Sequence, residues 1–281
     1  MDVLAKAATY VGFVLALGAG AFARFAYPAA PPSVRRTLAW GVAIGASLVA
    51  IGAAVDVTAV LERVTRGRYD AELLLQYLSA TRHGQASALR VVLALVAIAW
   101  GLRTLVGRAH VDRAAFGAFA LAWLASAAWV GHSGAMGLGG AIASLLHLVA
   151  VVAWVGVLSW LAWLPVWPDG AQLARAVTWV GRVGLAAVGV LSVTGIVMAR
   201  LHLDPPSAIA SSSYGAALIA KLALVAAVVG IAALNRFGRV PAFARGDRGP
   251  LLRSVRLESA LLAAVILATA VLATRPPVHG P

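Results

Sequence analysis

Eight long apolar stretches constrain the fold of this 281-residue chain more than any other feature of its sequence. Each is close to the roughly 20 residues that an α-helix needs to cross the hydrocarbon core of a bilayer. They therefore predict an all-α fold, a polytopic membrane bundle of about eight transmembrane helices. The stretches are Val3–Phe22, Leu38–Leu61, Leu89–Val106, Ala114–Val130, Ala141–Val166, Val177–Ala199, Tyr214–Leu234 and Leu257–Thr274.

The composition excludes other classes of protein. Hydrophobic residues make up 62% of the chain and charged residues 12%, whereas soluble domains carry about 25% charged residues. This deficit argues against a cytosolic enzyme and against a nucleic-acid partner, in spite of the net charge of +13. The first stretch could be a signal peptide, because Ala19-Gly20-Ala21 resembles a cleavage site. Its basic region is weak, since Asp2 offsets Lys6, and we therefore expect an uncleaved span.

The basic residues predict the orientation in the membrane. Fourteen of the 23 fall in the connections on one side and nine in those on the other. By the positive-inside rule the richer side is cytoplasmic, which places both termini in the periplasm. The arginines are spread over four loops, which favours a topology signal over a patch for anionic lipid or nucleic acid. The longest outer connection, Glu62–Ala88, contains a short apolar cluster that predicts an interfacial helix.

The two halves of the chain resemble each other. Arg90 follows Gly84 by six residues, and Lys221 follows Gly215 by the same distance. Thr9 precedes Gly18 by nine residues, as His147 precedes Gly156. We interpret residues 1–281 as one membrane domain built from a parallel repeat, with four helices in 1–131 and four in 132–281. The alternative is a chance match in sequence biased toward Ala, Val and Leu.

Histidine and methionine supply the candidate metal ligands. The chain contains no cysteine, which excludes disulfides and thiolate sites. His147 lies inside a predicted span, where an ionisable side chain is costly and indicates function. Imidazole and thioether ligands favour copper, with Cu(I) and Cu(II) both open. The predicted ligands lie toward the outer side of the second half: His132, His147, Met136, Met198 and His202.

Several of these residues also have a structural interpretation. His202 could simply end a helix before Asp204-Pro205-Pro206, and the methionines could be packing residues. Asp56 lies in the outer part of the second span and could pair with Arg90 or Lys221. Such a pair could fix helix packing or form part of an ion pathway.

The second half resembles the copper resistance protein D (CopD) family. The segments that carry the resemblance are Gly131-His132-Ser133, Leu146–Leu158, Thr194-Gly195, Tyr214–Lys221 and Asn235-Arg236 through Pro241. Val157 departs from it, since the family has a second glycine there. The resemblance implies an eight-helix protein of the bacterial inner (plasma) membrane that takes part in copper resistance or uptake, with His132 and His147 at the family's histidine positions. It also implies a periplasmic copper-binding partner (CopC-like); here a separate protein would have to deliver the metal, or no partner is needed.

The sequence therefore predicts a copper-handling membrane protein that binds copper at the periplasmic side and moves it across the membrane. Two alternatives are a haem-b electron-transfer protein with axial histidines and a factor that delivers copper to a respiratory oxidase. A scaffold that needs no metal is a third. We expect no enzymatic activity, because the chain has no Walker-type phosphate loop and no paired-carboxylate site. The direction of transport and the oligomeric state stay open.

Overall fold

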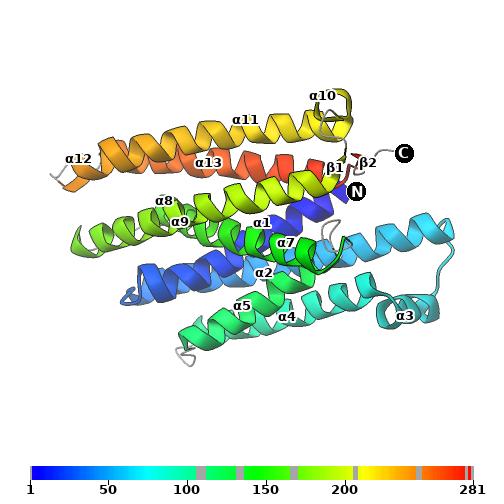
Figure 1. Ribbon diagram of the computed structural model, residues 1–281. Helices are drawn as coiled ribbons and strands as arrows, with labels where there is room; N and C mark the ends of the chain where they lie inside the picture. The colour runs from blue at the N-terminus through cyan, green and yellow to red at the C-terminus, as the bar shows by residue number, and fades with distance from the viewer. Residues whose placement is uncertain are drawn as a thin grey trace.

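The computed structural model describes residues 2–105, 112–130, 136–164, 170–204, 208–244, 249–275 and 278–279. Helices account for almost all of them (Figure 1). In chain order they are α1 (Asp2–Ala21), η1 (Phe22–Ala26), α2 (Pro32–Thr65), α3 (Ala71–Ala80), α4 (Arg82–Leu105), α5 (Arg113–Ala128), α7 (Leu138–Val151), η2 (Val152–Gly156), α8 (Val157–Trp163), α9 (Gly170–His202), α10 (Ala208–Ser211), α11 (Ser213–Leu234), η3 (Asn235–Arg239), α12 (Val240–Ala244) and α13 (Gly249–Leu272).

Seven of the described helical segments are long and apolar enough to cross a membrane. They are Val3–Ala26, Pro32–Thr65, Arg82–Leu105, Leu138–Trp163, Gly170–His202, Ser213–Phe243 and Gly249–Leu272. The remaining predicted span, Ala114–Val130, corresponds to α5, a shorter apolar helix of 16 residues. The predicted all-α polytopic membrane bundle is confirmed. Both termini lie at the same end of the bundle, as Figure 1 shows; we call it the terminal end.

The first helix lies at the centre of the bundle, where it packs against α2, η2, α8 and α13. Glycine allows the closest of these approaches. A Cβ on Gly18 would lie 2.6 Å from the Gly156 Cα, and a Cβ on Gly156 would lie 2.7 Å from the Gly18 Cα. Gly12 and Gly45 make a similar backbone contact between α1 and α2. The first half is therefore joined to the second by backbone packed on backbone.

The remaining helices follow the order of the chain. Helix α2 packs on α4, α4 on α5, α5 on α7 and α7 on α9, while α11 packs on α13. In each of these pairs the two helices are apolar and follow one another along the chain, apart from the short helices between some of them. At the terminal end two short strands, β1 (Leu203–Asp204) and β2 (Val278–His279), pair in parallel, with Leu203 opposite Val278.

The predicted interfacial segment forms α3, which packs on α4 at the terminal end. The Asp70 side chain caps its first turn by accepting a hydrogen bond from the Leu73 amide, at 2.9 Å. None of its ten residues is buried. A helix with an apolar face and no buried residue suits a position at the surface of the bilayer.

Helices α4 and α11 begin in the same way. The Gly84 amide donates to the Thr81 hydroxyl at 2.9 Å, and the Gly215 amide donates to the Ser212 hydroxyl at 3.0 Å. Each glycine also lies against the backbone of the short helix before it, α3 in one case and α10 in the other. The repeat inferred from the sequence stays a prediction, and these matched helix starts support it.

Candidate functional site

His147 lies in α7, nine residues after the helix begins at Leu138, which corresponds to about 14 Å of helix rise. Its Nδ1 atom is 2.9 Å from the Thr194 hydroxyl oxygen on α9. That hydroxyl donates its own hydrogen to the Val190 carbonyl at 2.7 Å, so toward His147 it can only accept. The hydrogen therefore sits on Nδ1, and the lone pair of the neutral ring sits on Nε2. Nε2 has no hydrogen-bond partner among the described residues.

Two further predicted ligands lie on α9 above Thr194, toward the terminal end. Thr194, Met198 and His202 are four residues apart and share one face of the helix; we call them the α9 row. His202 Nδ1 donates to the Met198 carbonyl at 2.6 Å, one helix turn earlier. The His202 ring is buried and stacks on Tyr214, with ring centroids 5.7 Å apart. The α9 row spans about 12 Å.

The other two predicted ligands come from the connection before α7. Met136 is half-buried and lies just before the start of that helix. The helix rise separates it from His147, so the two belong to different depths of the bundle. His132 lies outside the described residues. Within the described ranges no group of three or more His, Asp or Glu side chains is arranged to hold a metal ion.

Lys221 lies half-buried on α11, close enough to His147 to act on its charge electrostatically. No hydrogen bond or ion pair of its side chain is found in the part of the chain that the structure describes. A cation within electrostatic range of His147 disfavours a second positive charge there, and the repulsion is proportional to the charge of the incoming ion.

Asp56 does not form the ion pairs expected from the sequence. Its Oδ2 atom accepts hydrogen bonds from Lys6 Nζ at 3.1 Å and from His83 Nε2 at 3.0 Å. Lys6 lies on α1 and His83 on α4, so the buried carboxylate ties three helices together. Asp56 and His83 both lie near the terminal end, and the faces that α2 and α4 turn toward each other bring them together.

His83 continues this network to α3. Its Nδ1 atom is 2.8 Å from the Tyr77 hydroxyl. Because Nε2 donates to the carboxylate, Nδ1 of the neutral ring accepts from Tyr77. Burial raises the pKa of Tyr77, which keeps this hydroxyl protonated and able to donate. Both nitrogens of His83 are thus used by the protein itself. We call Lys6, Asp56, Tyr77 and His83 the Asp56 cluster.

Arg90 is buried about two helix turns along α4 from His83. Its Nη2 atom donates to the Ser126 carbonyl at 3.1 Å, and its own carbonyl accepts from Trp123 Nε1 at 3.1 Å. These bonds hold α4 against α5. The guanidinium still lies within electrostatic range of Asp56, but α5 supplies its hydrogen-bond partner.

A second buried carboxylate lies toward the opposite end of the bundle. Glu258 on α13 accepts a hydrogen bond from Asn235 Nδ2 at 2.7 Å. Arg239 donates to the Asn235 side-chain oxygen at 3.0 Å and to the Ser254 hydroxyl at 2.6 Å. The amide of Asn235 therefore links the acid to the arginine.

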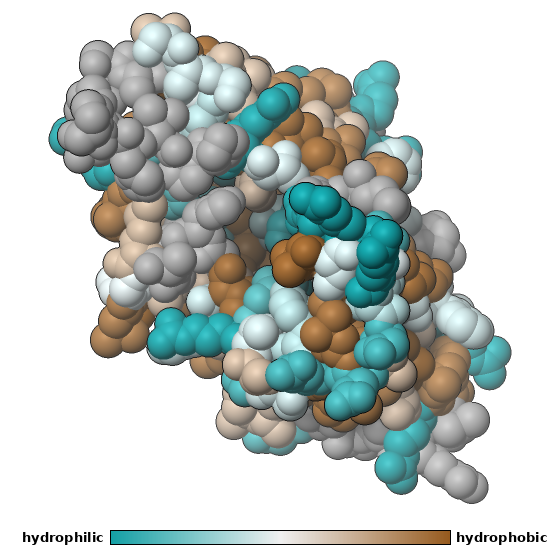
Figure 2. All heavy atoms as spheres, turned by 90° about the vertical axis from the view of Figure 1, so that its right-hand side faces the viewer, coloured by the Kyte–Doolittle hydropathy of each residue, from teal (hydrophilic) through white to brown (hydrophobic). Residues whose placement is uncertain are grey.

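Figure 2 shows the terminal end face-on, with hydrophilic side chains gathered on it.

Sequence reasoning missed three residues that define the geometry at this end: Thr194, His83 and Tyr77. Thr194 entered the sequence analysis only through the Thr194-Gly195 motif, which gave no indication of its contact with His147. The spacing of Tyr77 and His83 on either side of a helix start was the one available clue to their contact.

Comparison with known proteins identifies the family. The model of the N-terminal domain of copper resistance protein D-like proteins matches residues 1–141, and that of copper resistance protein D matches residues 174–272. The chain belongs to the copper resistance protein D family. The resemblance seen in the sequence motifs is thereby confirmed, and membership supports a copper-resistance membrane protein.

The chain is also similar to a named protein. Copper resistance protein D from Pseudomonas syringae pv. tomato is 32% identical over 155 residues, which cover 49% of this chain and 49% of that protein. The chain thus spans about half the length of the curated relative it matches. No solved structure matches this chain.

Proposed function

We propose that this protein binds copper at the terminal end of its second half and passes it across the membrane. The copper is cargo, and the protein acts as a transporter and not as an enzyme. The terminal end faces the periplasm of a bacterial inner membrane, in agreement with the excess of arginine at the opposite end. A periplasmic copper-binding protein of the CopC type would deliver the ion there.

The state of His147 carries this proposal. Histidines that bind metal usually donate the other ring N–H to an acceptor, which fixes the tautomer and aims the free nitrogen. Thr194 accepts that hydrogen bond and leaves the Nε2 lone pair for a metal ion. An ionisable side chain that is held this way inside a span is best explained by a bound ion.

The α9 row supplies a path to this nitrogen. Met198 and His202 lie one and two helix turns above the level of Thr194, so soft donors recur toward the terminal end. Thioether ligands favour Cu(I). Repulsion from Lys221 also penalises Cu(I) less than Cu(II), because it scales with ionic charge. His132 and Met136 remain proposed ligands of the entry region.

Copper binding by the purified full-length chain tests the proposal. Cu(I) and Cu(II) are titrated separately against chromogenic chelators, for the wild type, His147→Ala and the control His83→Gln. His83 is the matched control, because it lies at the same end but has both ring nitrogens occupied. Loss of a ligand should weaken binding by more than the roughly 10–100-fold typical of an outer-shell change, and H83Q should bind as the wild type does.

Copper accumulation in cells that express the same three variants tests transport. We expect wild type and H83Q to change cellular copper equally and H147A to have no effect. Unchanged binding and accumulation in H147A would overturn the proposal. A Soret band in the purified wild type would point to haem instead.

A further inference from the structure

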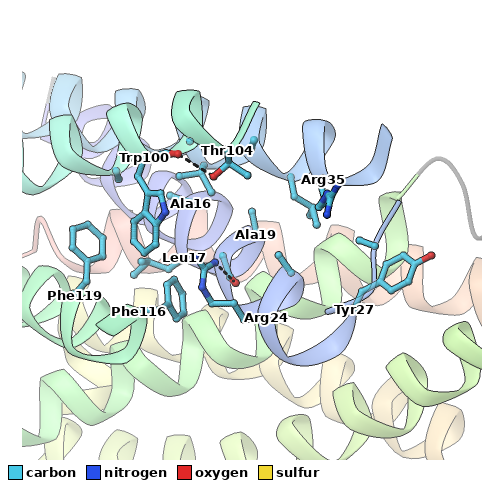
Figure 3. A pocket seen from close by; sticks show the side chains of 18 of the residues that line it. Ala16, Leu17, Ala19, Arg24, Tyr27, Arg35, Trp100, Thr104, Phe116 and Phe119 are labelled. Carbon is cyan, nitrogen blue, oxygen red and sulfur yellow. Dashed lines mark hydrogen bonds between the residues drawn. The ribbon is translucent and has the colours of Figure 1, made fainter. Parts of the chain in front are cut away.

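A cavity of about 290 Å³ lies at the end of the bundle opposite the termini, far from the α9 row (Figure 3). The last turns of α1 with η1, the first turns of α2, the end of α4 and the start of α5 surround it. Its walls are apolar at Leu17, Leu38 and Ala97, and aromatic at Trp100 and Phe116. The first half of the chain alone forms this cavity, so it is independent of the proposed copper site.

Arg24 extends into the cavity from η1. Its guanidinium lies 4.8 Å from the centre of the Trp100 ring and 4.7 Å from that of Phe116, and Figure 3 shows it beside these two rings. Gly20 makes room for this arrangement, since a Cβ there would lie 2.5 Å from Phe116 Cε2. The two ring centres are 6.4 Å apart, so the rings border the guanidinium from adjacent directions and leave part of its edge for hydrogen bonds.

Only some of the N–H groups of the Arg24 guanidinium form hydrogen bonds. Nη1 donates to the Gly20 carbonyl at 3.0 Å, whereas Nε is buried without a hydrogen-bond partner. No carboxylate in the described ranges forms an ion pair with Arg24. A shielded cation without a counter-charge is costly, and so is a buried donor without an acceptor. The structure therefore leaves room for an anion from outside the chain.

The surroundings define which anion fits. Arg35 lines the same cavity from the start of α2 and is exposed, which adds a second positive charge at the boundary of the membrane. Two arginines beside an apolar cavity at this depth match the two parts of an anionic phospholipid, a phosphate headgroup and an acyl chain. Free phosphate would satisfy the arginines but would leave the apolar wall without a partner.

We propose that this cavity, the Arg24 cavity, binds an anionic phospholipid. Arg24 and Arg35 hold the headgroup phosphate, and part of an acyl chain lies along Leu17, Leu38 and Ala97. Arginine is suited to this role because its planar fork can donate two parallel hydrogen bonds to a phosphate.

The test measures lipid binding to the full-length protein by native mass spectrometry and by thermal unfolding in detergent. Phosphatidylglycerol, phosphatidylcholine and inorganic phosphate are added separately. We expect phosphatidylglycerol to bind and stabilise the wild type more than phosphatidylcholine does, and inorganic phosphate to have no effect. Arg24→Gln and Arg35→Gln should each weaken phosphatidylglycerol binding roughly fivefold, as one basic residue near a membrane surface contributes.

Two further variants test whether the cavity itself binds the lipid. Arg36→Gln removes an exposed arginine next to Arg35 that does not line the cavity, and it should bind lipid as the wild type does. Ala97→Leu fills the apolar part while keeping both arginines, so it should lose the preference for phosphatidylglycerol even if R24Q fails to fold. Equal loss in R36Q, no loss in A97L, or stabilisation by inorganic phosphate alone would each overturn the proposal.

Discussion

The two halves of this protein use histidine at the terminal end in opposite ways. In the first half, His83 donates to Asp56 and accepts from Tyr77, so neither ring nitrogen is available. In the second half, His147 donates to Thr194 through Nδ1, and Nε2 has no partner among the described residues. The comparison shows that the state of each ring nitrogen, more than the presence of a histidine, separates a structural residue from a candidate ligand.

The charges differ in the same way. The Asp56 cluster pairs its buried carboxylate with Lys6 and His83, which closes the first half at this end. In the second half Lys221 is the charged residue near His147, and the described residues provide no ion pair for it. The polar residues of the first half thus have a structural role, because they neutralise each other. In the second half the charge near His147 is not neutralised by the described residues, as expected for a site that binds an ion.

Removing the carboxylate of the Asp56 cluster should have the largest effect on stability. Asp56→Ala leaves Lys6 and His83 without their acceptor, and breaking one side of a buried ion pair costs about 3–5 kcal/mol. Thermal unfolding in detergent measures the loss. Glu62→Ala, which removes an exposed acid from the same helix, is the control and should change stability little. If D56A is no less stable than E62A, the first half does not depend on this cluster.

Removing the acceptor of His147 should affect copper and leave the fold intact. Thr194→Val keeps the size of the side chain but leaves the ring without its hydrogen bond, and we expect copper affinity to fall roughly 10–100-fold. Thr178→Val is the matched control, because that exposed hydroxyl on α9 bonds only to the Ala174 carbonyl of its own helix. Chelator competition gives both affinities. Equal affinities would mean that Thr194 does not orient the histidine.

The smallest effect should come from the contact between α3 and α4. Tyr77→Phe removes one hydrogen bond to His83, which contributes about 1 kcal/mol. Hydrogen exchange of Ala71–Ala80 should therefore become roughly fivefold faster, while copper affinity stays the same. Tyr69→Phe, just before α3, serves as the control, since no hydrogen bond of that hydroxyl is found among the described residues. A change in copper affinity in Y77F would break the separation between the two halves.

The sequence was sufficient to predict the helices because their signal is local. Runs of apolar residues as long as a bilayer is thick predict spans without knowledge of their neighbours. The predicted stretch Ala114–Val130 and the 16-residue helix α5 agree closely, and both are shorter than a full span. Other helices, such as α2 with 34 residues, extend beyond their predicted stretches. The short helix α3 was also foreseen, since its apolar cluster is bounded by polar residues.

The contacts between helices could not be predicted in the same way. Asp56 was assigned to Arg90 or Lys221 because all three lie at similar depth, but depth does not define which faces meet. The rotation of α2 and α4 about their axes brings His83 to Asp56 and directs Arg90 to Ser126. Likewise, Thr194 became significant only when its hydroxyl was found beside His147. Pairing depends on tertiary packing that one sequence does not encode locally.

The contact between Gly18 and Gly156 has a consequence for how this chain can vary. Most helix contacts can absorb a mutation because a neighbouring side chain changes its rotamer. Here each residue faces the other's main chain, so an added methyl group meets atoms that have no rotamer to change. Relief would require the helices themselves to shift, and with them the relative placement of the Asp56 cluster and the α9 row. Among natural variants we therefore expect both positions to stay glycine while the residues around them exchange freely.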